Sequence, residues 1–281
     1  MLGAMTLSER NYLFRGMIII AALSLLLTIT GGYLAYPSFP AAASSAAFRA
    51  GGAIQKFFGR YAAPSAYAPF WTMMGAVAYS FASITLIYFF FEKTQSPEII
   101  FFGFFAFSLS FEAARIIIPL RVPFSFPAMY LTIAAQVLLF GRYFGLFSLF
   151  AASVYAAGFD SQKQRNIFFM LILSALVIAL TVPVDGLVWD STFKLLSGYG
   201  PMFAIVEAGI AAATIITFLI SAFTRGSRTY ILIGLGTLMA YAGRNMLLNA
   251  DTWVIPAAGI LFLGLGTWLI CSRLHKEYLW L

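Results

Sequence analysis

Residues 99–120 read IIFFGFFAFSLSFEAARIIIPL, and this stretch decides the class of fold. A bilayer core about 30 Å thick is crossed by about 20 apolar residues in a helix. The stretch has that length, but it also contains Glu112 and Arg115. It therefore predicts a membrane-spanning helix that carries charged side chains inside the membrane.

The whole chain has the composition of an integral membrane protein. Of its 281 residues, 62% are hydrophobic and only 10% are charged, whereas soluble domains have about 25% charged residues. This composition excludes a cytosolic enzyme, a secreted disulfide scaffold and a disordered tail. The net charge is +7, but the Lys and Arg residues form no dense cluster in the sequence. Positively charged loops of a membrane protein therefore explain the charge better than a nucleic-acid-binding surface does.

The sequence contains few residues suited to metal binding or nucleophilic catalysis. The single cysteine, Cys271, excludes an internal disulfide, and the single histidine, His275, leaves almost nothing for zinc or a Ser/His/Asp triad. Asp185 and Asp190 lie in one expected outside loop, but two carboxylates alone are poor evidence for a cation site. We expect no cofactor and no metal.

Eight apolar runs predict an all-α, polytopic membrane protein with eight spans. The runs are residues 15–36, 70–91, 99–120, 126–157, 167–184, 201–222, 230–249 and 253–272. The fourth run is interpreted as one tilted helix, although a break at Gly141 and Arg142 would give nine spans. Residues 1–45 also share features with a signal peptide, but their apolar part has full span length, so we expect a retained first helix.

The basic residues of the short loops predict the orientation. With eight spans and both termini cytoplasmic, nine Lys and Arg residues lie inside and five lie outside. The inside residues are Arg10, Arg15, Lys93, Lys163, Arg165, Arg225, Arg228, Arg273 and Lys276. This distribution follows the positive-inside rule, whereas nine spans would place the last three basic segments outside. We expect a plasma membrane protein of the bacterial inner-membrane type.

The outside segment 37–69 is the only long connection, and it carries an amphipathic pattern. Its apolar residues Ile54, Phe57, Phe58 and Tyr61 fall on one helical face, and its cations Arg49, Lys56 and Arg60 fall on another. This pattern predicts a helix that lies in the membrane interface. Such a helix either anchors the protein at the membrane surface or forms a gate over an outward cavity.

The two halves of the chain, residues 1–158 and 159–281, look related. Arg115 is followed twelve residues later by Pro127, and Arg244 is followed twelve residues later by Pro256. Arginines inside apolar spans are rare, so this repeated spacing indicates an internal duplication rather than chance resemblance between apolar sequences. Two four-helix copies would insert with the same orientation and form parallel repeats.

The charged residues inside the spans are the candidate ligand-binding site. Glu112 and Arg115 share a helical face, and Glu207 and Arg244 lie at similar depth, so an ion pair between them is expected. With the neighbours of Arg244 included, the set is Glu112, Arg115, Arg142, Glu207, Arg244, Tyr241 and Asn245. Three interpretations remain open. The charges lock the helices together, or their surplus arginines receive an anionic group in a cavity open to the outside, or they snorkel to the interface.

The sequence favours a transporter or translocator of a small anionic or amphipathic solute. The alternative is a non-enzymatic sensor or accessory subunit that binds a lipid or ligand and acts through a partner. A lipid-modifying enzyme lacks a convincing acid, base or nucleophile, so an enzyme is the less favoured reading. The expected partners are membrane lipids, a small anion and a membrane protein or a second copy of the chain, with no nucleic acid.

Overall fold

The computed structural model describes residues 5–47, 64–92 and 96–279. Within these residues, eight helices are long and apolar enough to cross a membrane, which confirms the predicted all-α membrane protein. The elements in chain order are α1 (Leu7–Ala35), the 3-10 helix η1 (Tyr36–Ser38), α2 (Phe39–Ser44), α4 (Ala68–Phe90), α5 (Pro97–Ser108), the 3-10 helix η2 (Leu109–Ile116), α6 (Ile117–Phe124), α7 (Ala128–Ala156), the 3-10 helix η3 (Ser161–Lys163), α8 (Gln164–Thr181), β1 (Val184–Trp189), β2 (Leu195–Ser197), α9 (Gly200–Thr224), α10 (Thr229–Leu248) and α11 (Val254–Leu279).

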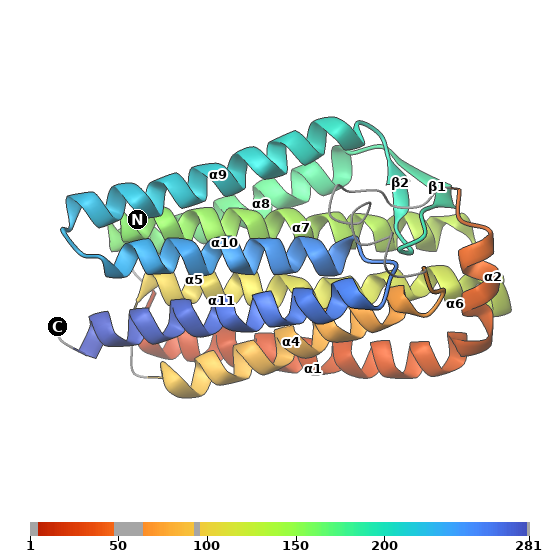
Figure 1. Cartoon of the computed structure of the whole chain (residues 1–281), viewed down its shortest axis with the longest axis horizontal. Helices are drawn as coiled ribbons and strands as arrows, with labels where there is room; N and C mark the ends of the chain where they lie inside the picture. Colours follow the sequence, from red (N-terminus) through yellow and green to blue (C-terminus); the bar gives the residue numbers. More distant parts are fainter. Residues whose placement is uncertain (1–4, 48–63, 93–95, 280–281) are drawn as a thin grey trace.

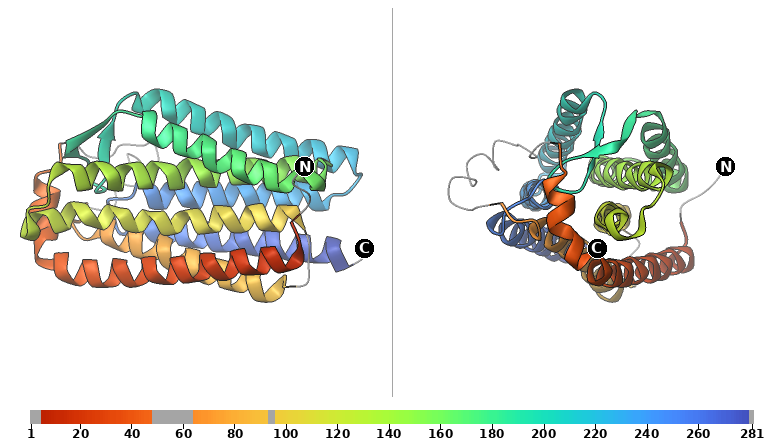
Figure 2. Two further views of the ribbon diagram at one scale, coloured as in Figure 1. Left: turned by 180° about the vertical axis from the view of Figure 1, so that it is seen from behind. Right: turned by 90° about the vertical axis from the view of Figure 1, so that its right-hand side faces the viewer.

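The long helices lie side by side and give the bundle two distinct ends (Figure 1). One end carries α2 and the antiparallel pair β1 and β2, and we call it the hairpin end. Both termini lie toward the opposite end, which we call the termini end (Figure 2). An even number of spans places both termini on the same side, so the picture agrees with the count of eight.

The third span, formed by α5, η2 and α6, is the central element of the bundle. In its most apolar window, 89% of the residues are buried, compared with 17% for α9. It packs against α1, α4 and α7. Its start is well defined, because the Ser96 hydroxyl accepts a hydrogen bond from the Ile99 N–H and Pro97 occupies the first turn. The stretch that decides the fold is therefore also the core.

The middle of the third span is a 3-10 helix rather than an α-helix. Residues 109–116 adopt this tighter form over eight residues, which is longer than the usual run of about 3–4 residues. In a 3-10 helix, side chains three residues apart are eclipsed, so Glu112 and Arg115 lie directly one above the other. The sequence pattern did not distinguish this segment from a continuous α-helix.

The last two spans, α10 and α11, approach each other closely through glycines. A Cβ atom built on Gly243 would lie 2.6 Å from the Gly259 carbonyl oxygen and 2.7 Å from the Leu263 backbone nitrogen. Only a residue without a side chain fits there, and small residues commonly allow such close packing of membrane helices. This contact fixes the position of the neighbouring Arg244.

The described residues settle one detail of the predicted topology but not a second. The fourth span is one unbroken helix, Ala128–Ala156, so the alternative with a break at Gly141 and Arg142 is wrong. The predicted interfacial segment is described only in part. Its residues Arg49, Ile54, Lys56, Phe57, Phe58, Arg60 and Tyr61 lie outside the described residues.

Candidate functional site

The Glu112 carboxylate is the centre of the buried charges. Its Oε2 lies 3.3 Å from Arg115 Nη1, and its Oε1 lies 3.3 Å from Arg142 Nε. The Glu112 side chain is 3% exposed, and those of Arg115 and Arg142 are 1% and 14% exposed. One carboxylate therefore neutralises two guanidinium groups, from η2 and from α7, away from water.

Arg115 has partners for all of its guanidinium nitrogens. In addition to the ion pair with Glu112, its Nε donates to the carbonyl oxygen of Thr192 over 2.9 Å, and its Nη2 donates to the same oxygen. Thr192 lies in the turn between β1 and β2. Arg115 therefore holds the β1–β2 hairpin against the third span, which is a structural role.

Arg142 and Arg244 are less completely paired. Arg244 donates from Nη2 to the Arg142 backbone carbonyl over 2.8 Å, and the whole residue is 1% exposed. Within the described part of the chain, the buried atoms Arg142 Nη2 and Arg244 Nη1 have no hydrogen-bond partner. A buried charged N–H without a partner is costly, so two strong donors remain at this site.

The expected ion pair between Glu207 and Arg244 is not formed. Among the described residues, no ion pair reaches Glu207, and Arg244 is directed to the backbone of α7 instead. Glu207 acts on Arg142 and Arg244 only at longer range. The side chains of Tyr241 and Asn245 are half-buried and make no hydrogen bond within the described segments.

A cavity of about 320 Å³ lies beside Arg142 at the hairpin end. Its charged lining residues are Arg142, Asp190 and Lys194, and the first residues of α9, Gly200 and Pro201, complete the wall. Of the four cationic side chains here, Arg115 and Arg142 contact the Glu112 carboxylate, Lys194 contacts the Asp190 carboxylate, and Arg244 bonds only a backbone carbonyl among the described residues. Even when the more distant Glu207 is counted with Glu112 and Asp190, the four cationic side chains outnumber the three carboxylates.

Asp190 and Lys194 form an ion pair at the rim of this cavity. Lys194 Nζ lies 3.6 Å from Asp190 Oδ2 and donates to Asn249 Oδ1 over 2.8 Å. Asp190 Oδ1 also accepts hydrogen bonds from the Thr192 N–H at 2.9 Å and the Thr192 hydroxyl at 2.7 Å. The Asp190 carboxylate is thus already used by the protein, whereas Asp185 is exposed and bonds the Leu187 N–H.

The surroundings of this ion pair shift the pKa values of both Asp190 and Lys194. Burial opposes ionisation of Asp190, but the Lys194 charge and the Thr192 hydrogen bonds outweigh it and lower the pKa of Asp190. Burial lowers the pKa of Lys194 to about 8, although the Asp190 charge partly opposes that shift. Lys194 is therefore a cation at neutral pH that loses its charge in mildly alkaline solution.

Three contributors to this site were missed by sequence reasoning. The sequence marks Lys194 only as one of the basic residues in the outside loops and Asp190 only as a weak candidate for a cation site, and the Thr192 carbonyl oxygen has no side-chain signal at all. The spacing from Asp190 to Lys194 across a Ser-Thr turn was the available clue. In the part of the chain that the structure describes, no group of three or more His, Cys, Asp or Glu residues could hold a metal ion.

Comparison of the chain with protein-family models, with curated proteins and with solved structures finds no match.

Proposed function

We propose that this protein transports a small anionic solute across the membrane and binds it in the cavity beside Arg142. The observation that carries the proposal is that Arg142 and Lys194 both line one cavity, and that the buried Nη2 of the same Arg142 guanidinium group has no hydrogen-bond partner among the described residues. A guanidinium group binds carboxylate, phosphate and sulfate through paired hydrogen bonds. An anion in the cavity would bind this guanidinium group and add to its incomplete set of partners.

The start of α9 adds to the preference for an anion. Gly200 and Pro201 line the cavity and form the first turn of a helix of 25 residues. The N-terminus of a helix carries partial positive charge, and its free N–H groups point outward. Arg142, Lys194 and the N-terminus of α9 thus each contribute positive potential to the cavity, and the negative charge of Asp190 reduces it.

We infer that the cavity faces away from the cytoplasm. The described basic residues near the ends of the spans lie in the first part of α1, around η3, between α9 and α10 and in the last part of α11; they are Arg10, Arg15, Lys163, Arg165, Arg225, Arg228, Arg273 and Lys276. These segments lie at the termini end (Figure 1), and cytoplasmic loops are the ones rich in Lys and Arg. The hairpin end, which carries the cavity, would then face outward. On this proposal, both termini are cytoplasmic and the protein belongs to a plasma membrane of the bacterial inner-membrane type.

The proposed duplication and interfacial helix fit into the same scheme. The arginines of the third and seventh spans, Arg115 and Arg244, both approach the Glu112 and Arg142 pair. Parallel repeats with a site at their seam would produce such a convergence. The described residues on either side of the amphipathic segment both lie at the hairpin end. Ala47 donates a backbone hydrogen bond to Trp189, and Pro64 forms a β-bridge with Thr252. An interfacial helix there would lie at the cavity side of the membrane.

The test is binding followed by uptake, with sulfate and succinate as probes. In detergent, each probe should raise the unfolding temperature of the wild type, and Arg142→Gln should abolish that rise. Lys163→Gln is the matched control, because Lys163 is a loop cation at the termini end that contacts the Phe159 ring. In proteoliposomes, the wild type and Lys163→Gln should take up the bound probe, and Arg142→Gln should not.

The same experiment separates transport from the sensor alternative. Binding without uptake, together with a stoichiometric partner in native membranes, would replace the transporter proposal with a ligand-binding accessory subunit. If neither probe shifts the unfolding temperature of the wild type, the anion-transport proposal fails; a lower unfolding temperature of Arg142→Gln would then show that the charges serve to lock the helices.

A further inference from the structure

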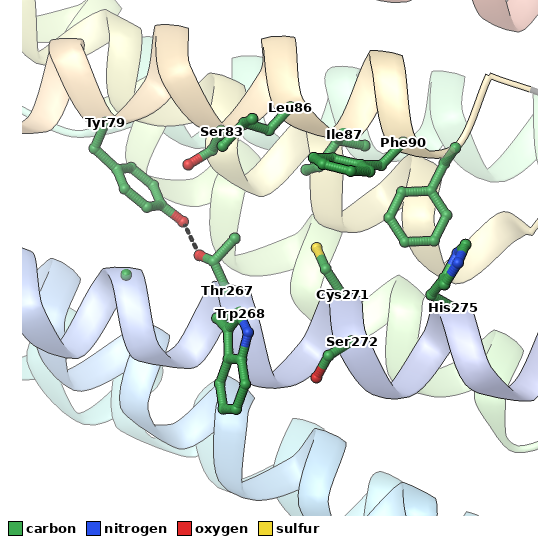
Figure 3. Close-up of a pocket in the computed structure, with 12 residues that line it drawn as sticks. Tyr79, Ser83, Leu86, Ile87, Phe90, Thr267, Trp268, Cys271, Ser272 and His275 are labelled. Atoms are coloured by element: carbon green, nitrogen blue, oxygen red, sulfur yellow. Dashed lines mark hydrogen bonds between the residues drawn. The ribbon is translucent and has the colours of Figure 1, made fainter.

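A second cavity lies at the opposite end of the bundle, between α4 and α11. Its volume is about 370 Å³, within the range of about 300–1,000 Å³ that ligand sites occupy. Figure 3 shows Ile87 and Phe90 on α4 facing Cys271 and His275 on α11 across this space. The Arg142 site is at the hairpin end, so the two cavities are separate.

Contacts between α4 and α11 close this groove at both ends. Toward the centre of the bundle, the Tyr79 hydroxyl lies 2.5 Å from the Thr267 hydroxyl (Figure 3). Because the Thr267 hydroxyl donates to the Leu263 carbonyl oxygen, Tyr79 is the donor of this pair. Toward the termini end, the rings of Phe91 and His275 meet edge to face with centroids 5.7 Å apart. The groove is therefore a bounded pocket rather than an open seam.

The pocket opens sideways, toward the lipid. Leu86, Phe90 and Trp268 form its outer rim and are 54%, 69% and 67% exposed. The hydroxyls of Tyr79, Thr267 and Ser272 are already bonded within the protein, and the remaining lining is apolar except for Ser83, Cys271 and His275. A mostly apolar space with so few polar partners is a poor site for water, so its occupant comes from the hydrocarbon.

The shape of the pocket selects a thin occupant. A transmembrane helix has a diameter of about 10–12 Å and cannot enter a space that cross-contacts close at both ends. A single hydrocarbon chain can enter it from the side. A cation lies at the termini end, because the exposed Lys276 follows Ser272 by four residues and so shares its helical face. Lysine at that level attracts the phosphate of an anionic lipid.

We propose that the groove between α4 and α11 binds one acyl chain of an anionic phospholipid whose headgroup contacts Lys276. The polar pair of Tyr79 and Thr267 forms the floor that limits the depth of the chain. The site is independent of the proposed transport function, since no residue of it lines the Arg142 cavity.

The experiment uses phosphatidylglycerol with a photoreactive diazirine near the end of its acyl chain, in vesicles of phosphatidylcholine. Gly264→Phe fills the groove, because Gly264 lines it and a Cβ there meets no atom within 4 Å. Gly209→Phe is the matched control, since Gly209 is an exposed glycine of α9 with the same open space. After illumination, labelled peptides are mapped by mass spectrometry.

The wild type and Gly209→Phe should be labelled on the peptides that contain Ser83 and Cys271, and Gly264→Phe should lose at least four-fifths of that label. Labelling of the wild type should also saturate as the fraction of probe rises, a result that needs no variant. Equal labelling of Gly264→Phe, a label that rises linearly with probe, or a crosslink between two copies through this groove would overturn the proposal.

A second arm tests the headgroup. The same chain carried by phosphatidylcholine should label the wild type several-fold less than the phosphatidylglycerol probe. Lys276→Gln should reduce labelling by the phosphatidylglycerol probe to that lower level and leave the phosphatidylcholine probe unchanged. Equal labelling by both probes in the wild type would remove Lys276 and the anionic headgroup from the proposal.

Discussion

Along α5 the third span is held by aromatic rings, whereas along η2 it is held by one shared carboxylate. Phe101 stacks on Tyr155 with centroids 5.2 Å apart, and Phe104 stacks on Phe168 at 4.8 Å. In η2, the Glu112 carboxylate pairs with both Arg115 of the same segment and Arg142 of α7. Both segments are buried, but the aromatic segment spreads its stabilisation over many contacts. The charged segment concentrates it in one side chain, and the two should respond differently to substitution.

The largest effect is expected from Glu112→Gln, which conserves volume but removes the negative charge. Loss of one partner from a buried ion pair costs about 3–5 kcal/mol, and here two guanidinium groups lose their counter-charge. The free energy of unfolding should fall by that amount, measured by thermal or denaturant unfolding in detergent. Glu207→Gln is the control, because Glu207 has no ion pair within the described chain. Similar losses in both variants would contradict the central role of Glu112.

Gly243→Ala should have the next largest effect, because the added methyl group meets the backbone of α11. Overpacking of this kind costs about 1–3 kcal/mol, and it would shift Arg244 away from α7. Gly209→Ala provides the comparison, since a Cβ at Gly209 touches nothing within 4 Å. The two alanine variants should differ in unfolding temperature, with only Gly243→Ala below the wild type. If the charged segment tolerates displacement of α10, their unfolding temperatures will coincide.

Phe104→Leu probes the aromatic segment and should cost about 1.5 kcal/mol, because leucine keeps most of the side-chain volume and leaves only a small cavity. The neighbouring rings keep most of their contacts, so the loss stays local. Unfolding measured in the same detergent allows a direct comparison with Glu112→Gln. A loss for Phe104→Leu as large as that for Glu112→Gln would show that the two segments do not differ in how they distribute stabilisation.

The smallest effect is expected at the rim of the charged region, from the titration of Lys194. With a pKa of about 8, Lys194 is charged at pH 7 and mostly neutral at pH 9. Sulfate keeps its charge over this range, so its binding should weaken several-fold as pH rises, by less than about 1.4 kcal/mol. Isothermal titration calorimetry at both pH values measures the change. Lys194→Arg should bind sulfate equally at both, because a guanidinium group stays charged; an unchanged pH dependence in that variant would assign the titration to another group.

The apolar architecture was predictable from the sequence, because length and hydropathy are local properties. The predicted run 70–91 corresponds to Ala68–Phe90, and the run 201–222 corresponds to Gly200–Thr224. The contact between Glu112 and Arg115 followed from their spacing of three residues. These features depend only on residues that are neighbours in the chain.

The rest of the site depends on contacts between distant segments. The link from Arg142 to Glu112 joins residues 30 positions apart, and the link from Arg115 to Thr192 joins residues 77 apart. The second uses a backbone carbonyl, which every residue has, so no residue type could reveal it. Glu207 and Arg244 were matched by depth, but depth does not specify which way two helices face each other.

The eclipsed arrangement of Glu112 and Arg115 also bears on the assembly of the protein during synthesis. Arg142, Thr192 and Arg244 are translated after the third span, so none of them can neutralise it when it first enters the bilayer. The ion pair within η2 connects residues of one segment and can form as soon as that segment becomes helical. The third span can thus leave the ribosome with its two costly charges already compensated, and the hairpin and the later arginines join a segment that is already in place.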